Sequence, residues 1–427
     1  MTLKRDARAA LPRLLTPLFL LVMLSTLAYF TAVGMILPTL PRYVEGPLGG
    51  NNAAVGVTIG AFGLTAVLLR PFSGRTSDRR GRRILIVGGG LLVGLSIAGY
   101  ALSASLPSLV FWRLLTGVGE AFYYVGAASV INDLAPDERR GEALSYFSLA
   151  LFGGLALGPV TGESILQSIG FSWVWIVAGA SAAFAGLIGL MVPDTRPAGM
   201  HEAPKAPLIH KAALLPGTIL ATNIWALATF SSFIPLYVLT IGMSGSRFVF
   251  ALNSAIIIAI RLFGARLPDR LGARKAGTAA LATTAVGLFV IALWPSEIAL
   301  YAGTAIYSIG HALAFPALMT FALSRAPASE RGAVVGTFTA FFDFSFGFGA
   351  ASAGVIAEVL GYRGAFVGGA IVALGGLALL RWAARRSAAR RAAEIRIAPA
   401  EVVAPGDELE GRGVPRAEEA AIEGAGR

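Results

Sequence analysis

The sequence predicts an all-α integral membrane protein in which twelve transmembrane helices form two pseudo-symmetric six-helix bundles. Three observations support this fold class: an apolar composition, twelve apolar runs of membrane-spanning length, and an internal repeat. Of the 427 residues, 56% are hydrophobic and 14% are charged, and the mean hydropathy is +0.71. Soluble domains are about 45–50% apolar and about 25% charged, so this composition excludes most soluble classes and disordered chains. The absence of cysteine excludes a disulfide scaffold and metal-thiolate chemistry.

Each apolar run has roughly the 20 residues that cross the hydrocarbon core of a bilayer. The runs lie near residues 14–40, 53–72, 84–104, 107–131, 143–166, 171–192, 213–240, 246–267, 276–295, 297–323, 332–359 and 364–384. A Pro-rich segment divides six runs from six. We therefore expect a cytoplasmic N-terminus (1–13), an N-terminal bundle (14–192) and a cytoplasmic linker (193–212). A C-terminal bundle (213–384) and a disordered cytoplasmic tail (385–427) follow.

The positive charges predict the orientation. The net charge is +11, and 29 of the 35 Lys and Arg residues fall in the segments that lie inside if the N-terminus is cytoplasmic. Only Arg42, Arg247 and Arg363 fall in external loops. Because cytoplasmic loops of membrane proteins are enriched in Lys and Arg, both termini are predicted to be cytoplasmic. This topology accounts for the charge, and we expect no nucleic-acid partner.

The two halves align at a single offset of 191 residues. Arg70 aligns with Arg261, and Gly81 aligns with Gly272. The same offset relates many other charged and turn residues over roughly a hundred positions. Two six-helix halves of like topology are typical of transporters whose halves rock around a central site, which gives alternating access.

The loop between the second and third runs reads GRTSDRRGRR. It resembles the G-x-L-x-D-R-x-G-R-R signature of the major facilitator superfamily, and the resemblance covers residues 14–384. The first copy of the motif comprises Gly74, Asp78, Arg79, Gly81 and Arg82, and a weaker second copy comprises Asp269, Arg270 and Gly272. Glycine permits a tight turn at Gly81 and a close helix approach at Gly74. The resemblance implies that Asp78 locks the halves on the cytoplasmic side. The alternative is that the arginines of this loop do no more than fix the topology.

The fifth run contains Gly154, Gly158, Pro159 and Gly162. This pattern resembles the G-x-x-x-G-P-x-x-G-G motif of drug:proton antiporters, with Glu163 in place of the last Gly. The four-residue glycine spacing predicts a smooth face for close helix contact, and Pro159 predicts a bend. The resemblance favours an exporter.

Ionisable residues inside the runs are candidates for function, because charge in the hydrocarbon is costly. Arg113 and Glu120 share one face of the fourth run, about 10.5 Å apart along the axis. Glu120 lies beside Tyr123 and Tyr124. A desolvated carboxyl there is suited to loading and releasing a proton. The alternative is a permanently charged Glu120 that is bound to a cation.

Glu120 aligns with His311 at the offset of 191, so we hypothesise that they face one another as a titratable pair. A neutral His311 that bridges helices is the alternative. Asp343, in an aromatic stretch of the eleventh run, is expected to be a cavity acid for cationic or polar ligands or to pair with an arginine such as Arg261. Asn223 is a weaker cavity candidate.

We therefore expect a multi-pass secondary transporter of the bacterial inner membrane that exports small amphipathic compounds in exchange for protons. A facilitator or importer of a sugar or other metabolite is the alternative, and a non-transporting sensor is a more distant one. The sequence contains no phosphate-binding loop, metal-spaced cluster or nucleophile elbow. We expect no enzymatic activity, cofactor or metal, and we expect a monomer whose partners are a small-molecule substrate, protons and the lipid bilayer.

Overall fold

The structure is a computed structural model that describes residues 14–136, 139–195, 209–263, 271–327 and 330–397. Within these ranges the regular structure is helical, with no strand. The helices of the N-terminal half are α1 (Pro17–Glu45), α2 (Asn52–Arg80), α3 (Arg82–Gly99), α4 (Leu106–Leu134), α5 (Arg140–Ile169) and α6 (Phe171–Ile188). Those of the C-terminal half are α7 (Lys211–Thr240), α8 (Arg247–Phe263), α10 (Ala273–Leu293), α11 (Glu297–Leu323) and α12 (Arg331–Ile397).

The predicted fold class is confirmed. Ten helices in the described ranges are long and apolar enough to cross a membrane. Helix α12 contains two of the predicted spans, because its backbone turns at Gly361, where φ is 71° and ψ is 176°. Helix α8 has 17 described residues, and the predicted span over 246–267 continues beyond them. With α8 counted once and α12 twice, the helices correspond to the twelve predicted spans.

Glycines with positive φ mark the same turns in both halves. Gly81, between α2 and α3, has φ of 96°, and Gly272, before α10, has φ of 76°. Gly170, between α5 and α6, has φ of 91°, and Gly361 has φ of 71°. Glycine adopts this backbone region without the steric cost that an L side chain carries. Since both pairs differ by 191 residues, the repeat seen in the sequence is a repeat of structure.

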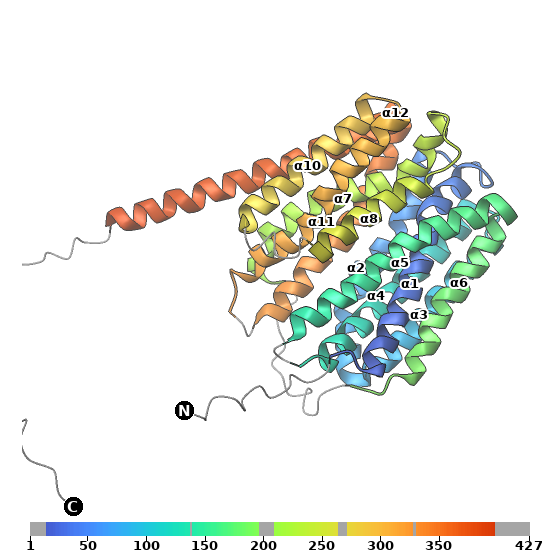
Figure 1. Ribbon diagram of the computed structural model, residues 1–427, viewed down its shortest axis with the longest axis horizontal. Coiled ribbons are helices and arrows are strands. Elements are labelled where there is room, and N and C mark those ends of the chain that lie inside the picture. Colours follow the sequence, from blue (N-terminus) through green and yellow to red (C-terminus); the bar gives the residue numbers. More distant parts are fainter. Residues whose placement is uncertain (1–13, 137–138, 196–208, 264–270, 328–329, 398–427) are drawn as a thin grey trace, which may run out of the picture. The chain divides into compact units, whose positions relative to one another are not determined.

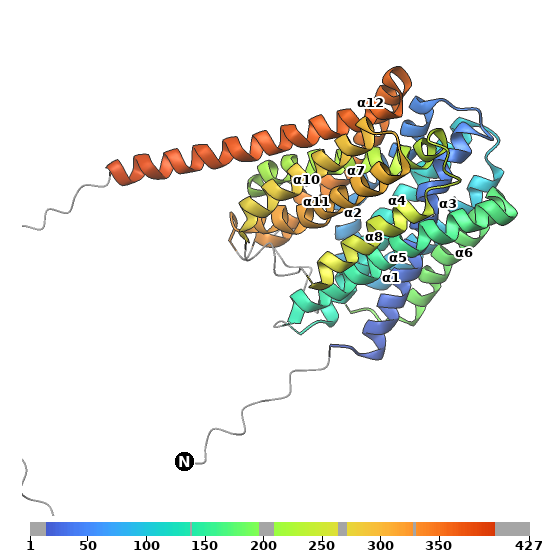
Figure 2. The same cartoon turned by 45° about the horizontal axis from the view of Figure 1, so that its top comes forward.

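Each half has its own internal contacts. Helix α1 packs against α5 and α6, and α3 packs against α4 and α6. In the C-terminal half, α11 packs against α7, α8 and α10. The halves meet where α5 lies against α8 and α1 lies against α7 (Figures 1 and 2). The two helix sets, coloured blue to green and yellow to orange, therefore share a common interface.

Glycines allow the closest helix approaches. A Cβ atom on Gly158 would lie 2.5 Å from the Cα atom of Gly34, which confirms that the glycine face of α5 makes a close contact, here with α1. Between the halves, a Cβ atom on Gly60 of α2 would lie 2.3 Å from the carbonyl oxygen of Gly347 of α12. Any larger residue at these positions would push the helices apart.

The C-terminal segment Ala384–Arg427 forms a unit separate from Met1–Ala383. Helix α12 continues to Ile397, within the segment that the sequence analysis assigns to the tail. The rest of that tail, most of the predicted linker and the predicted N-terminal segment lie outside the described residues.

Candidate functional site

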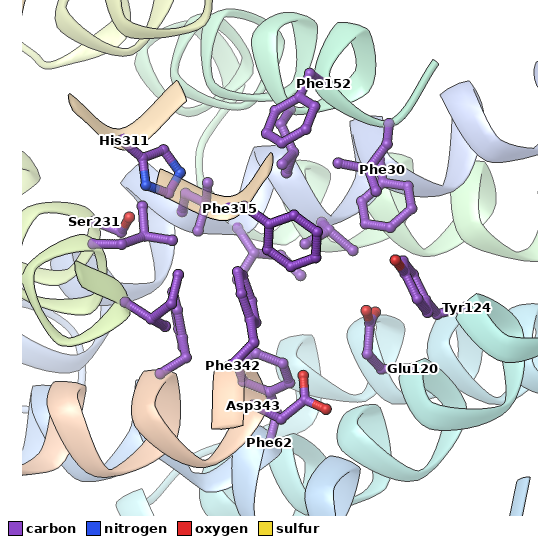
Figure 3. Close-up of a pocket in the computed structure, with 18 of the residues that line it drawn as sticks. Phe30, Phe62, Glu120, Tyr124, Phe152, Ser231, His311, Phe315, Phe342 and Asp343 are labelled. Carbon is purple, nitrogen blue, oxygen red and sulfur yellow. The ribbon is translucent and has the colours of Figure 1, made fainter. Parts of the chain in front are cut away.

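A cavity of about 280 Å³ lies between the two halves and is lined by residues of α1, α2, α4, α5, α7, α8, α11 and α12 (Figure 3). Most of its wall is aliphatic or aromatic. The charged residues of the wall are Arg70, Arg113, Glu120, Arg261 and Asp343, and the uncharged polar ones include Asn223, Asn253, Ser231 and His311. An apolar wall with a few placed polar groups is typical of a small-molecule site.

Glu120 is a cavity residue, as the sequence predicts. Its Oε2 atom accepts a hydrogen bond of 2.7 Å from the hydroxyl of Tyr29 in α1. The Tyr29 ring stacks on Tyr123, with ring centroids 3.7 Å apart, and the Tyr123 hydroxyl lies 2.7 Å from that of Ser25. Tyr124 lines the cavity, whereas Tyr123 is fully buried behind Tyr29. Tyr123 therefore positions the group that holds Glu120.

Arg113 also lines the cavity, but its guanidinium is occupied by the backbone of α2. Its Nε and Nη2 atoms donate to the carbonyl oxygens of Thr58 and Ile59 at 3.0 and 2.9 Å. Its Nη1 atom donates to the Tyr100 hydroxyl at 3.3 Å, and the guanidinium lies 4.7 Å from the centroid of the Phe62 ring. Arg113 thus ties α4 to α2.

Asp343 forms an ion pair with Arg70, which links α12 of one half to α2 of the other. The alternative that Asp343 pairs with an arginine is confirmed, but the partner is Arg70 and the suggested Arg261 is wrong. Arg261 instead lies over the ring of Phe152 in α5, 4.0 Å from its centroid. The pairing differs because α2, not α8, packs against this part of α12, through Gly63.

His311 lies on the C-terminal side of the cavity. Its Nδ1 atom is 3.3 Å from Oδ1 of Asn223, and the Nδ2 atom of Asn223 donates to the Thr284 hydroxyl at 2.9 Å. Figure 3 shows His311 and Glu120 on opposite sides, with the ring of Phe315 between them in that view. The two groups share one cavity, each with its hydrogen-bond partner in its own half.

Hydrogen bonds join the two halves at the end of the bundle that holds Glu163. This carboxylate is fully buried, accepts from Arg42 at 2.9 Å within the N-terminal half, and accepts from the backbone N–H of Ser246, in the C-terminal half, at 2.9 Å. The Ser246 hydroxyl donates to it at 3.3 Å. At the same end, the backbone N–H of Asn52 donates to Glu358 at 2.9 Å. These bonds join the two halves.

The signature loop lies at the other end. Arg82 is buried, and its Nε atom pairs with Asp133 at 3.1 Å while its Nη1 atom donates to the Ser77 hydroxyl at 2.7 Å. Its backbone N–H donates to Asp194 at 3.2 Å. Arg82 therefore binds α2, α3 and α4 together and does more than fix the topology.

Other expectations for this loop have mixed outcomes. The turn at Gly81 is confirmed by its positive φ. The close approach at Gly74 is wrong, because no described atom lies within 4 Å of the place a Cβ would take. Arg79 lies in the last turn of α2. The side chain of Asp78 lies outside the described part of the chain, as do Asp269 and Arg270.

Residues 22–296 and 246–405 match the Major Facilitator Superfamily. The chain belongs to the Major Facilitator Superfamily. Among its relatives, an uncharacterised MFS-type transporter of Salmonella typhimurium is 29% identical over 361 residues, 82% of this chain and 92% of the relative. One of Pseudomonas aeruginosa (strain PAO1) is 30% identical over 373 residues, 84% of this chain and 90% of the relative.

Solved structures share the superfamily fold. A bacterial homologue of the human lysosomal transporter Spinster, inward-facing and occupied, has a TM-score of 0.73 at 16% identity and covers 86% of this chain and 96% of its own. The human organic anion transporter MFSD10 has a TM-score of 0.67 at 20% identity and covers 85% and 98%. At such identities the likeness shows the fold alone. The chain is thus a multi-pass membrane protein of a transporter superfamily.

Sequence reasoning missed two residues of this superfamily member's site. Glu163 was noted only as a departure from the glycine motif, yet it joins the halves. Arg70 enters the sequence analysis only as the position that aligns with Arg261, yet it pairs with Asp343. The cost of charge in the hydrocarbon was the signal available for both.

Proposed function

We propose that this protein is a proton-coupled secondary transporter of the bacterial inner membrane that exports small amphipathic compounds by alternating access. The observation that carries the proposal is the place of Glu120: a carboxyl on the wall of the cavity between the halves, hydrogen-bonded to the neutral hydroxyl of Tyr29. A group that gains and loses a proton needs surroundings that tolerate both its ionised and its protonated form. A hydroxyl can donate to the ionised carboxylate and accept from the protonated carboxyl.

The other charged groups of the cavity support this assignment. Asp343 is engaged by Arg70, and Arg113 is engaged by the α2 backbone. Glu120 is therefore the carboxyl we assign to proton uptake and release, and Asp343 holds a cross-half contact that the cycle can make and break. His311 stays a candidate for the proton path, and a His311→Gln variant with an unchanged pH profile of transport would remove it.

Export and orientation rest on the sequence features already described. The charge distribution supports cytoplasmic termini, which makes the Glu163 end the external one. Bonds between the halves at that end support a conformation that is closed there. Release to the outside then requires those bonds to break while the opposite end closes, which is the alternating-access cycle. The phenylalanine-rich wall favours amphipathic substrates, and a monomer contains the whole cavity.

The test is proton coupling in proteoliposomes. Purified protein is reconstituted with a pH-sensitive dye inside, and a panel of amphipathic cations, anions and neutral compounds is added to wild type, Glu120→Gln and Glu297→Gln. Glu297 is an exposed carboxyl at the start of α11 and is the matched control for the loss of one negative charge. We expect compound-dependent proton flux in wild type and Glu297→Gln and none in Glu120→Gln. Compound movement without proton flux, unchanged in Glu120→Gln, would instead establish a facilitator.

A further inference from the structure

We infer that the substrate is a small organic anion and that Arg261 binds its anionic group. This inference rests on the proposal that the cavity is the transport site and names the class of substrate it takes. Three arginines line the cavity. Arg113 donates to two backbone carbonyls and a hydroxyl, and Arg70 pairs with Asp343. Two of the three are therefore satisfied by the protein itself.

Arg261 differs from both. Its Nε atom is shielded from solvent and has no hydrogen-bond partner among the described residues. Its guanidinium lies over the ring of Phe152, 4.0 Å from the centroid, an attraction that leaves the N–H groups at its edge unused. A buried donor without an acceptor is costly, and an arginine can bind a carboxylate through two parallel hydrogen bonds. Arg261 is thus a donor that lacks an acceptor, on the wall of a cavity.

The internal repeat indicates which partner Arg261 lacks. The offset of 191 residues relates Arg70 to Arg261 and Asp343 to Phe152. Both arginines contact a helix of the opposite half at equivalent positions, Arg70 at Asp343 and Arg261 at Phe152. The first contact has a carboxylate and the second has a phenyl ring. The position that would complete the second pair is therefore open to a carboxylate or sulfonate from the substrate.

The remaining wall suits such a ligand. With both carboxyls ionised, the three arginines and two acids give the cavity one net positive charge. Phe152 and Phe315 line the same cavity (Figure 3) and supply apolar contact for an aromatic or alkyl body. The cavity volume of about 280 Å³ limits the ligand to a small molecule. The ligand class is a monoanion on a small apolar body, which narrows the amphipathic compounds proposed above.

The test measures equilibrium binding, so it does not depend on proton flux. The full chain is placed in phosphatidylcholine nanodiscs, and calorimetry measures binding of 2-naphthoate, 2-naphthalenesulfonate and octanoate against the neutral 2-naphthamide. The variants are Arg261→Gln, Arg261→Lys, Phe152→Asp and the matched control Phe152→Leu. Phe152→Asp is the sharpest, because it gives Arg261 an internal partner like that of Arg70. Thermal unfolding checks that each variant is folded.

We expect the anions to bind both wild type and Phe152→Leu, and to bind them more tightly than naphthamide does. Arg261→Gln and Phe152→Asp should bind the anions about ten- to a hundredfold more weakly, the range for loss of a charge-assisted hydrogen bond. Arg261→Lys should retain part of the affinity. Binding of naphthamide should change little in Arg261→Gln and Arg261→Lys, and the ratio of anion to naphthamide affinity should fall in Phe152→Asp but not in Phe152→Leu.

Three results would overturn the inference. The first is a wild type without preference for the anions over naphthamide. The second is unchanged anion binding in folded Arg261→Gln and Phe152→Asp. The third is anion binding that disappears when phosphatidylglycerol is added to the nanodiscs, which would make a lipid headgroup the occupant. Proton coupling can fail while naphthoate still binds, and anion binding can fail while Glu120-dependent flux of cations persists, so the two proposals are tested separately.

Discussion

Replacing Glu163 by Gln should shift the protein toward the state that is open at the Glu163 end. The carboxylate bonds to Ser246 across the interface between the halves, through the backbone N–H at 2.9 Å and the hydroxyl at 3.3 Å. Glutamine keeps the shape and one acceptor oxygen but removes the charge. Its bond to Arg42 lies within the N-terminal half, so weakening that bond affects both states and largely cancels.

The magnitude follows from the two bonds that cross the interface. A hydrogen bond to a charged group contributes about 1.5–3 kcal/mol and a neutral one about 0.5–1.5 kcal/mol, so each bond loses about 1 kcal/mol. The total of about 2 kcal/mol corresponds to a change of about 30-fold in the ratio of open to closed molecules. This shift is large enough to measure without unfolding the protein.

The assay uses the absence of cysteine from the chain, which lets a single introduced thiol report without background. Leu37→Cys places that thiol in α1, on the cavity wall. A maleimide that does not cross membranes is added to whole cells, and the labelling rate is compared in the Glu163→Gln and Glu297→Gln backgrounds. We expect about 30-fold faster labelling with Glu163→Gln and no change with Glu297→Gln. Equal rates in the two backgrounds would refute the assignment of Glu163 as a bond between the halves.

Three further predictions concern helix packing, protein stability and the effect of the membrane potential on transport. Gly60→Val should lower thermal stability by about 1–3 kcal/mol, because the Cβ atom would lie 2.3 Å from the carbonyl oxygen of Gly347. It should also speed maleimide labelling of the Leu37→Cys thiol. Unchanged stability would mean that α2 and α12 need not be in contact. Arg82→Gln should destabilise the protein by about 3–5 kcal/mol in thermal unfolding, since it leaves Asp133 buried without its cation, and Asp133→Asn should recover part of the loss. If an anion leaves the cell as a proton enters, both movements carry positive current inward. A potassium diffusion potential that is negative inside should therefore accelerate export of 2-naphthoate. Each charge contributes about 2.3 kcal/mol per 100 mV of potential.

Much of the fold could be predicted from sequence because its signals are local. A run of apolar residues predicts a span without knowledge of any partner, and a glycine such as Gly81 predicts its own turn. The carboxyl of Glu120 could be placed in the cavity for the same reason, since the cost of burying it does not depend on which helix lies opposite. These features need only the chain near the residue.

The partners of the charged groups could not be predicted, because they depend on how the two halves meet. Asp343 pairs with Arg70 and not with Arg261, since α2 rather than α8 approaches α12 at that level. Gly74 has the residue type for a close helix contact but has no described atom within 4 Å of its Cβ position, whereas Gly60 makes such a contact. Residue type shows that a contact is possible, and only the packing shows where it is made.

The internal repeat offers a way to separate residues that serve the fold from those that serve transport. Positions alike in both halves, such as Gly81 and Gly272, hold turns that each half needs to fold. Among the pairs that differ in charge are Glu120 with His311, Phe152 with Asp343, and Glu163 with Gly354. The first two pairs line the cavity, and Glu163 closes one end of it. A transporter built from two like halves must differ between them to bind an asymmetric molecule and to move it in one direction. In these three pairs the difference lies where the proposed chemistry takes place, at the proton carrier, at the anion-binding arginine and at the bond that must break for release.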